Sequence, residues 1–94
     1  MKQTTFSQKS AETLALQGIA FLAGDDDRIQ RFFTATGLDP AALRSSVDDS
    51  STLAGVLDFI LGDEKLVQEF AEFAGITPEE PALARRSLPG FEHW

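Results

Sequence analysis

Few residues of this chain have side chains suited to chemistry, and the most reactive types are scarce. The chain has no cysteine, and its only histidine is His93, next to the last residue. Without thiols, a cysteine nucleophile, a thiolate metal site and a disulfide are all excluded. Chain ends are usually poorly ordered, so His93 is badly placed to act as a general base. We therefore expect no catalytic residues; an enzyme that uses only Asp and Glu stays open, because a sequence cannot show convergent carboxylates.

Two acidic runs, at residues 25–27 and 48–49, raise the question of a metal site. A calcium loop spaces its ligands at alternate positions and adds a glycine and a distal glutamate, whereas Arg28 and Ile29 follow the first run. Helix capping explains both runs, since Asp and Ser are preferred at helix N-termini. The glycines near these runs are dispersed and form no phosphate-binding loop. The sequence therefore predicts no metal and no cofactor.

The charges are unevenly distributed along the chain. Residues 1–47 hold five basic and five acidic residues, whereas residues 48–94 hold three basic and ten acidic ones, which accounts for the whole net charge of −7. Nucleic acid is a poor partner for such a chain, because phosphate binding needs clustered Lys and Arg. An acidic half attracts a basic protein, and Glu69 and Glu72 are our candidate contacts there. The alternative is that these residues only solvate outer helix faces.

Capping residues and apolar spacing predict six helices. Ser10 is the expected N-cap of the first helix and Gly24 its left-handed end; Asp39-Pro40 opens the third helix, and Thr77-Pro78 is expected to open the sixth in the same way. The predicted positions are 10–23, from 25–27 to Gly37, about 40–43, 51–61, 63–74 and around 83–84. The first helix should be central, because Leu16, Ala20 and Phe21 widen its apolar surface beyond one stripe.

The chain repeats itself after 38 positions without a gap. Phe21 and Phe32 fall on Phe59 and Phe70, and the flanking glycines and prolines also match. The predicted fold is an all-α, compact bundle of about six short helices, built from two tandem helix-turn-helix-turn-short-helix repeats at 10–46 and 51–87. Phe32 and Phe70 should then occupy equivalent places in one core. The alternative is that similar capping makes any two helical hairpins look alike.

The two ends of the chain differ in character. Residues 1–9 are polar apart from Phe6 and are expected to form a flexible arm before a single domain at 10–87. Residues 88–94 form an aromatic tail in which Phe91 and Trp94 follow a Pro-Gly pair. These aromatics either fold back over the chain's own helices or anchor a partner or a second copy, so a homodimer stays open.

Two strings of residues carry a resemblance to a known family. Residues 11–17, Ala-Glu-Thr-Leu-Ala-Leu-Gln, and residues 37–40, Gly-Leu-Asp-Pro, together with Phe21, Phe32 and Phe70, resemble the bacterial family called domain of unknown function 3572. The resemblance covers about residues 10–87 and implies a short, single-domain helical protein. It implies no activity or ligand.

The preferred function is that of a protein-interaction or regulatory module. No stretch reaches the roughly 18 apolar residues of a membrane span, and no signal peptide opens the chain, so we expect a cytoplasmic protein without membrane contact. The alternative function is a binder of a small apolar ligand between the two repeat units, since eight Phe residues are enough to line a pocket.

Overall fold

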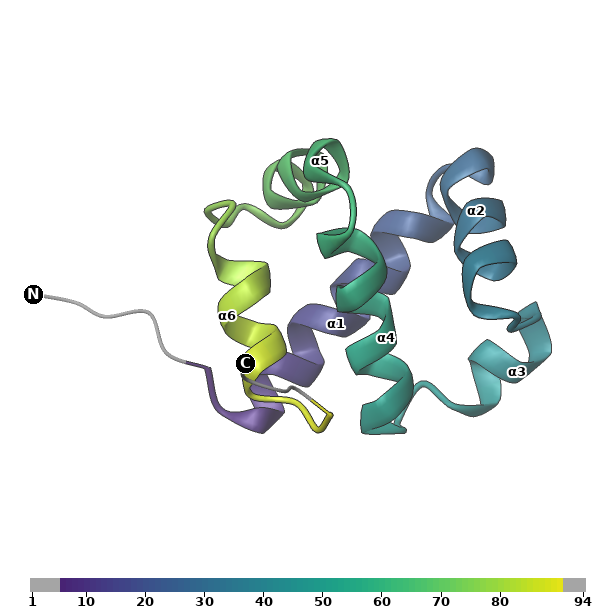
Figure 1. Ribbon diagram of the computed structural model, residues 1–94, viewed down its shortest axis with the longest axis horizontal. Helices are drawn as coiled ribbons and strands as arrows, with labels where there is room; N and C mark the ends of the chain where they lie inside the picture. Colours follow the sequence, from purple (N-terminus) through teal and green to yellow (C-terminus); the bar gives the residue numbers. More distant parts are fainter. Residues whose placement is uncertain (1–5, 91–94) are drawn as a thin grey trace, which may run out of the picture.

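The computed structural model describes residues 6–90, which form helices and turns and contain no strand. The helices are α1 (Gln8–Ala23), α2 (Asp26–Thr36), α3 (Pro40–Ser45), α4 (Ser50–Leu61), α5 (Glu64–Ala74) and α6 (Glu80–Arg86). The predicted all-α bundle of six helices is confirmed. α1 and α4 cross in the middle, with α2 and α3 on one side and α5 and α6 on the other (Figure 1). Between residues 6 and 90, no helix has the length and apolar character needed to cross a bilayer.

The first helix begins earlier than predicted. Ser7, not Ser10, is its N-cap: the Ser7 hydroxyl accepts the Ser10 N–H at 3.1 Å, and the Ser10 hydroxyl accepts the Ser7 N–H at 3.0 Å. This reciprocal pair is a capping box in which serine takes the third position that Glu or Gln usually occupies. Residues 8 and 9 therefore belong to α1 and not to the arm. The Phe6 carbonyl accepts a 2.7 Å hydrogen bond from the Ser87 hydroxyl, which ties this end of the chain to the end of α6.

Helix ends follow the predicted glycines, with one correction. Gly37 and Gly75 end α2 and α5 in the left-handed conformation, at φ 76° and 71°. Gly24, predicted to be left-handed, has φ −75°, and its N–H still bonds to the carbonyls of Ala20 and Phe21. The helical turn thus continues through Gly24. The extended backbone of Asp25, at φ −142° and ψ 122°, breaks the helix instead and starts α2 at once.

The start of α6 differs from the prediction as well. Asp39 caps α3 as expected, because its carboxylate accepts the Ala42 N–H at 2.7 Å. Thr77-Pro78 does not repeat this arrangement, and α6 begins only at Glu80. Threonine lacks the carboxylate of Asp39. Instead, the Glu80 carboxylate accepts the Thr77 N–H at 2.9 Å, which satisfies the backbone before the helix begins.

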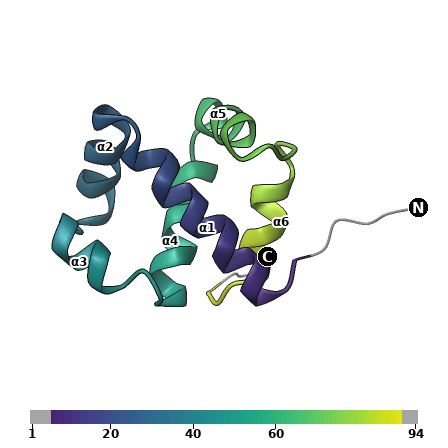
Figure 2. The same cartoon turned by 180° about the vertical axis from the view of Figure 1, so that it is seen from behind.

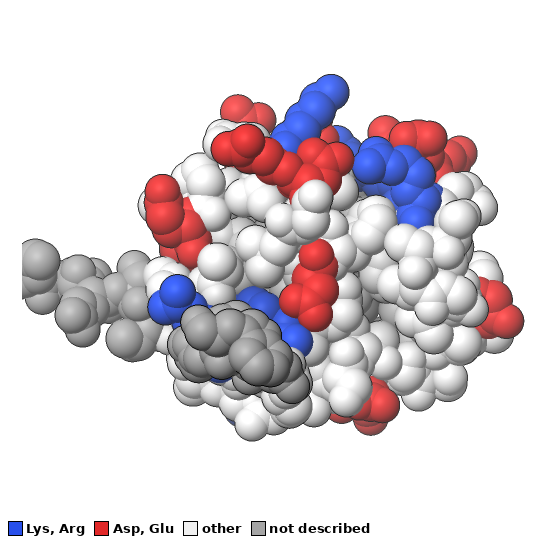
Figure 3. Space-filling view, in the orientation of Figure 1, with Lys and Arg blue, Asp and Glu red and all other residues white. Residues whose placement is uncertain are grey.

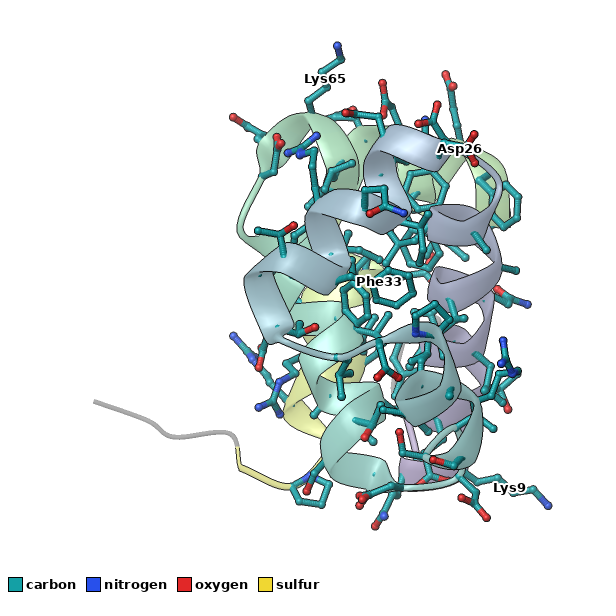
Figure 4. The ribbon with its side chains drawn as sticks, turned by 90° about the vertical axis from the view of Figure 1, so that its right-hand side faces the viewer. Lys9, Asp26, Phe33 and Lys65 are labelled. Atoms are coloured by element: carbon teal, nitrogen blue, oxygen red, sulfur yellow. The ribbon has the colours of Figure 1, made fainter. Side chains whose placement is uncertain are left out.

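The core is built around α1, which packs against α2, α4, α5 and α6 and is the central helix that the sequence predicted. One face of α1 is nevertheless uncovered, as the view from behind shows (Figure 2). Leu16 and Ala20 lie on the exposed part, and Leu16 is 45% exposed, so the expected apolar surface of α1 is only partly covered. The large buried side chains are Leu14, Phe21, Leu22, Phe32, Leu43, Leu53, Val56, Leu57, Ile60, Leu66, Phe70 and Leu88. Phe33 points into the bundle between helices, whereas Lys9, Asp26 and Lys65 project from its two ends (Figure 4).

Two aromatic contacts cross between the halves of the chain in a matched way. The rings of Phe21 and Phe70 lie 5.4 Å apart, and those of Phe59 and Phe32 also lie 5.4 Å apart. The 38-residue shift exchanges these two pairs. This match supports the internal duplication, which stays a prediction. The third helices do not follow it: α6 packs closely on α1 and α4, whereas α3 packs on neither to the same extent.

Arg85 holds the chain after α6 against α4. Arg85 is 7% exposed, and its guanidinium donates to the Asp58 carboxylate at 2.7 Å and to the carbonyls of Leu88 and Pro89 at 3.3 and 3.1 Å. We expect Arg85→Met, which keeps an unbranched apolar stem but not the hydrogen-bond donors, to lower the free energy of unfolding by about 2 kcal/mol. The matched control is Arg86→Met at an exposed neighbour, where a change within about 0.5 kcal/mol is expected. Equal effects in urea unfolding would contradict this role of Arg85.

Candidate interaction surface

Of the four predicted contact residues, the structure describes two. Phe91 and Trp94 lie outside the described residues. Glu69 and Glu72 lie on α5, three positions apart, and are therefore neighbours on one face of the helix. Both line a shallow depression of about 450 Å³ whose other residues are Phe21, Arg28 and Phe73. We call these five residues the Phe73 surface.

Phe73, like Arg28, belongs to this surface although the sequence did not mark it as a contact. Its side chain is 56% exposed, the highest value among the large apolar residues of the described chain. One edge of the ring contacts Phe21, with the centroids 5.5 Å apart. Phe73 lies beside the stripe of Leu66 and Phe70 that faces the core, so apolar spacing does not separate it from the core. The only sequence signal is that the 38-residue shift aligns it with Ala35, a small residue. Large exposed aromatics flanked by polar residues are typical of contact surfaces.

Arg28 joins the same surface from α2. Its guanidinium carbon lies 4.3 Å from the centroid of the Phe21 ring, and one guanidinium nitrogen donates to a Glu69 carboxylate oxygen at 3.1 Å. Arg28 and Glu69 are 26% and 35% exposed. One guanidinium thus contacts an aromatic face and a carboxylate together. Because 41 positions separate Arg28 from Glu69, spacing along the chain gave no sign of the pair.

One group of charged side chains lies over the N-terminal ends of α2 and α5, along the upper edge of the molecule, and others are scattered over the same face (Figure 3). Arg31 lies between two carboxylates there, 3.3 Å from Asp63 and 3.8 Å from Asp27. The capping interpretation of the acidic runs is confirmed, because Asp25 accepts the N–H groups of residues 27 and 28 and Asp49 accepts that of Ser51. Within residues 6–90, no group of three potential ligands is placed to hold a metal ion.

Asp63 combines a cap with an ion pair. The hydrogen bond from the Lys65 N–H, and then that from Arg31, hold the pKa of Asp63 below its ordinary value, although partial burial works in the opposite direction. At pH values between the lowered pKa of folded Asp63 and its ordinary pKa, the unfolded chain binds more protons than the folded one. The stabilisation from Asp63 is therefore present above a pH of about 4 and is lost as the pH falls through the lowered pKa.

We expect this loss to disappear in Asp63→Asn. Asparagine also caps helices, so the variant keeps the bond to Lys65 but loses the titrating group and the charge that faces Arg31. The difference in unfolding free energy between the two proteins should be largest at neutral pH and should shrink as pH falls below about 4. Urea unfolding at several pH values measures it. A difference of constant size from pH 7 to pH 3 would show that Asp63 acts only as a cap.

The comparison with family models gives one decisive match. The model described as a protein of unknown function, DUF3572, covers residues 8–91 of the 94-residue chain. The chain belongs to the DUF3572 family. The resemblance seen in the sequence is therefore confirmed, and the match begins at the first residue of α1. No curated protein and no solved structure is significantly similar to this DUF3572 chain.

Proposed function

We propose that this DUF3572 domain is a protein-interaction module without catalytic activity, and that it binds a basic segment of a partner protein at the Phe73 surface. The observation that carries the proposal is the 56% exposure of Phe73 beside two carboxylates, Glu69 and Glu72. An aromatic ring that is half in water gains stability when a partner covers it. Interface residues that contribute most to binding are often such aromatics.

Charge supports a basic partner. The second half of the chain, which includes α5, carries an excess of seven negative charges. Of the two carboxylates of the Phe73 surface, only that of Glu69 forms an ion pair within residues 6–90, with Arg28. Negative potential over the surface accelerates the approach of a positively charged segment. A second copy of this acidic chain is repelled on average. Nucleic acid is disfavoured for the same reason.

The packing between α1 and α4 does not favour the second candidate function, an apolar-ligand binder. These helices meet at Gly18, where an added Cβ atom would lie 3.1 Å from side-chain carbons of both Val56 and Ile60. Such an approach leaves no room for a ligand at that point of contact. The depression at the Phe73 surface is open and lined in part by charged residues. Interaction with a protein is therefore the function we retain.

Photocross-linking in the cells that produce the protein tests the proposal. A photoreactive amino acid replaces Gln68, an exposed residue of α5 beside Glu69 and Glu72, and in the control it replaces Gln8, an exposed residue at the opposite end of α1. We expect a specific adduct from position 68 only, and a cross-linked segment of the partner that is rich in Lys or Arg. The same adducts from both positions, or an acidic or apolar cross-linked segment, would overturn the proposal.

A further inference from the structure

We infer that the Phe73 surface selects arginine over lysine in its partner; this inference rests on the proposed function. The protein already contains the contact that an incoming arginine would make. Arg28 places its guanidinium over the Phe21 ring, at 4.3 Å from the centroid, while it donates to Glu69 at 3.1 Å. Aromatic face, guanidinium and carboxylate are thus joined in one arrangement, and a second aromatic, Phe73, lies beside it.

Phe73 has two of the three parts of this arrangement. Its ring contacts Phe21 on one side, and the residue as a whole is 56% exposed. Glu69 lies one turn before it on α5 and so on the same face, and exposed Glu72 adjoins Glu69. The part that is missing is a cation above the ring of Phe73. A partner's side chain that stacks there enters the depression that Glu72 also lines, and the Glu72 carboxylate is the acceptor we assign to its edge.

Arginine meets this demand better than lysine does. A guanidinium is planar and weakly hydrated, so its face stacks on an aromatic ring while its N–H groups point outward to a carboxylate. A lysine ammonium is a compact, strongly hydrated charge, and it gains less from the ring. At exposed sites a cation above an aromatic ring contributes about 0.5–1 kcal/mol, which corresponds to about a two- to five-fold change in affinity for each stacked side chain.

The test uses two synthetic peptides of equal length and charge, in which glycine and serine separate either three arginines or three lysines. Nuclear magnetic resonance titration of the whole chain measures both dissociation constants and maps the shifts. We expect shifts at Phe73 and Glu72 with both peptides, and tighter binding of the arginine peptide, by up to about two- to five-fold for a single stacked side chain. No shift at these residues with either peptide would overturn the proposed function together with the inference. Equal affinities at the surface would overturn the inference alone.

Three variants separate the ring from the charge. Phe73→Leu keeps an apolar side chain and removes the aromatic face, so the arginine peptide should lose its advantage, while the affinity of the lysine peptide should fall less. Glu72→Gln should weaken both peptides, and Glu79→Gln, an equal charge change at an exposed residue before α6, should weaken them less. An arginine preference that survives in Phe73→Leu contradicts the inference. Self-association in light scattering that Phe73→Leu abolishes assigns the surface to a second copy and contradicts it as well.

Discussion

Truncation of Phe70 to alanine is expected to lower the free energy of unfolding by about 4 kcal/mol. Phe70 is fully buried, and its ring contacts Phe21 at 5.4 Å. Alanine removes the transfer energy of a large side chain and leaves a cavity between α1 and α5, which the rigid helices fill only in part. A domain of this size is stabilised by roughly 5–14 kcal/mol, so the loss is a large share of the total. Urea unfolding followed by circular dichroism measures it, and Phe70→Leu, which leaves a smaller cavity, provides a milder variant.

The matched substitution in the first half of the chain tests the duplication. Phe32 is 1% exposed and contacts Phe59 at 5.4 Å, as Phe70 contacts Phe21. If the two positions are equivalent, Phe32→Ala should cost about as much as Phe70→Ala, to within about 1 kcal/mol. Phe73→Ala serves as the control on α5, because an exposed ring contributes much less to the core. A cost for Phe32→Ala as small as that for Phe73→Ala would argue against equivalent surroundings.

The features that were predictable from the sequence are local ones. Gly37 and Gly75 end helices, Asp39 with Pro40 begins one, and Asp63 caps another, because each of these acts on backbone groups within four residues. Apolar spacing also placed Leu57, Phe70 and most other core residues correctly. Such signals are short in range, so they need no knowledge of how the helices pack.

The features that the sequence did not predict are of two kinds. Some depend on contacts with residues far along the chain, and others on a choice between two nearby residues that both suit the same helix end. Ser7 and Ser10 both suit an N-cap, and only the reciprocal bonds of the folded helix decide between them. In the sequence, Arg85 is only one of three basic residues in the second half, whereas in the structure it is buried and donates to Asp58, 27 positions earlier. The order of the helices alone does not show which face of α1 is left uncovered. Leu16 is therefore more exposed than the sequence predicts.

The candidate surface shows the same division. Glu69 and Glu72 were chosen for charge, and the structure does bring them together at one depression. The exposure of Phe73 is not predictable from apolar spacing, because an apolar residue next to a core stripe is usually part of the core. Its exposure follows from the position of α5, which turns Phe70 inward and leaves Phe73 at the rim against Phe21. Arg28 required the fold itself, since α2 and α5 meet only in three dimensions.

The second large effect is expected at the crossing of α1 and α4, where Gly18→Leu should lower the free energy of unfolding by about 2–3 kcal/mol. Gly18 is buried, and even a Cβ atom there would lie 3.1 Å from Val56 and Ile60 and 3.8 Å from Phe70. A leucine has to push α1 and α4 apart or force these side chains out of their rotamers. Its better helix propensity returns only about 0.8 kcal/mol. Thermal unfolding should therefore show a fall of about 8–24 °C in Tm.

Alanine at the two helical glycines shows whether the crossing itself is the cause. Gly55 lies inside α4 with no atom within 4 Å of an added Cβ, so Gly55→Ala should raise the free energy of unfolding by about 1 kcal/mol through helix propensity. Gly18→Ala gains the same propensity but meets two side chains at 3.1 Å, and it should fall short of Gly55→Ala by about 1 kcal/mol. If both variants gain equally, the seam between α1 and α4 has room to spare. An apolar ligand between α1 and α4 would then no longer be disfavoured, because its exclusion depends on the same close approach at Gly18.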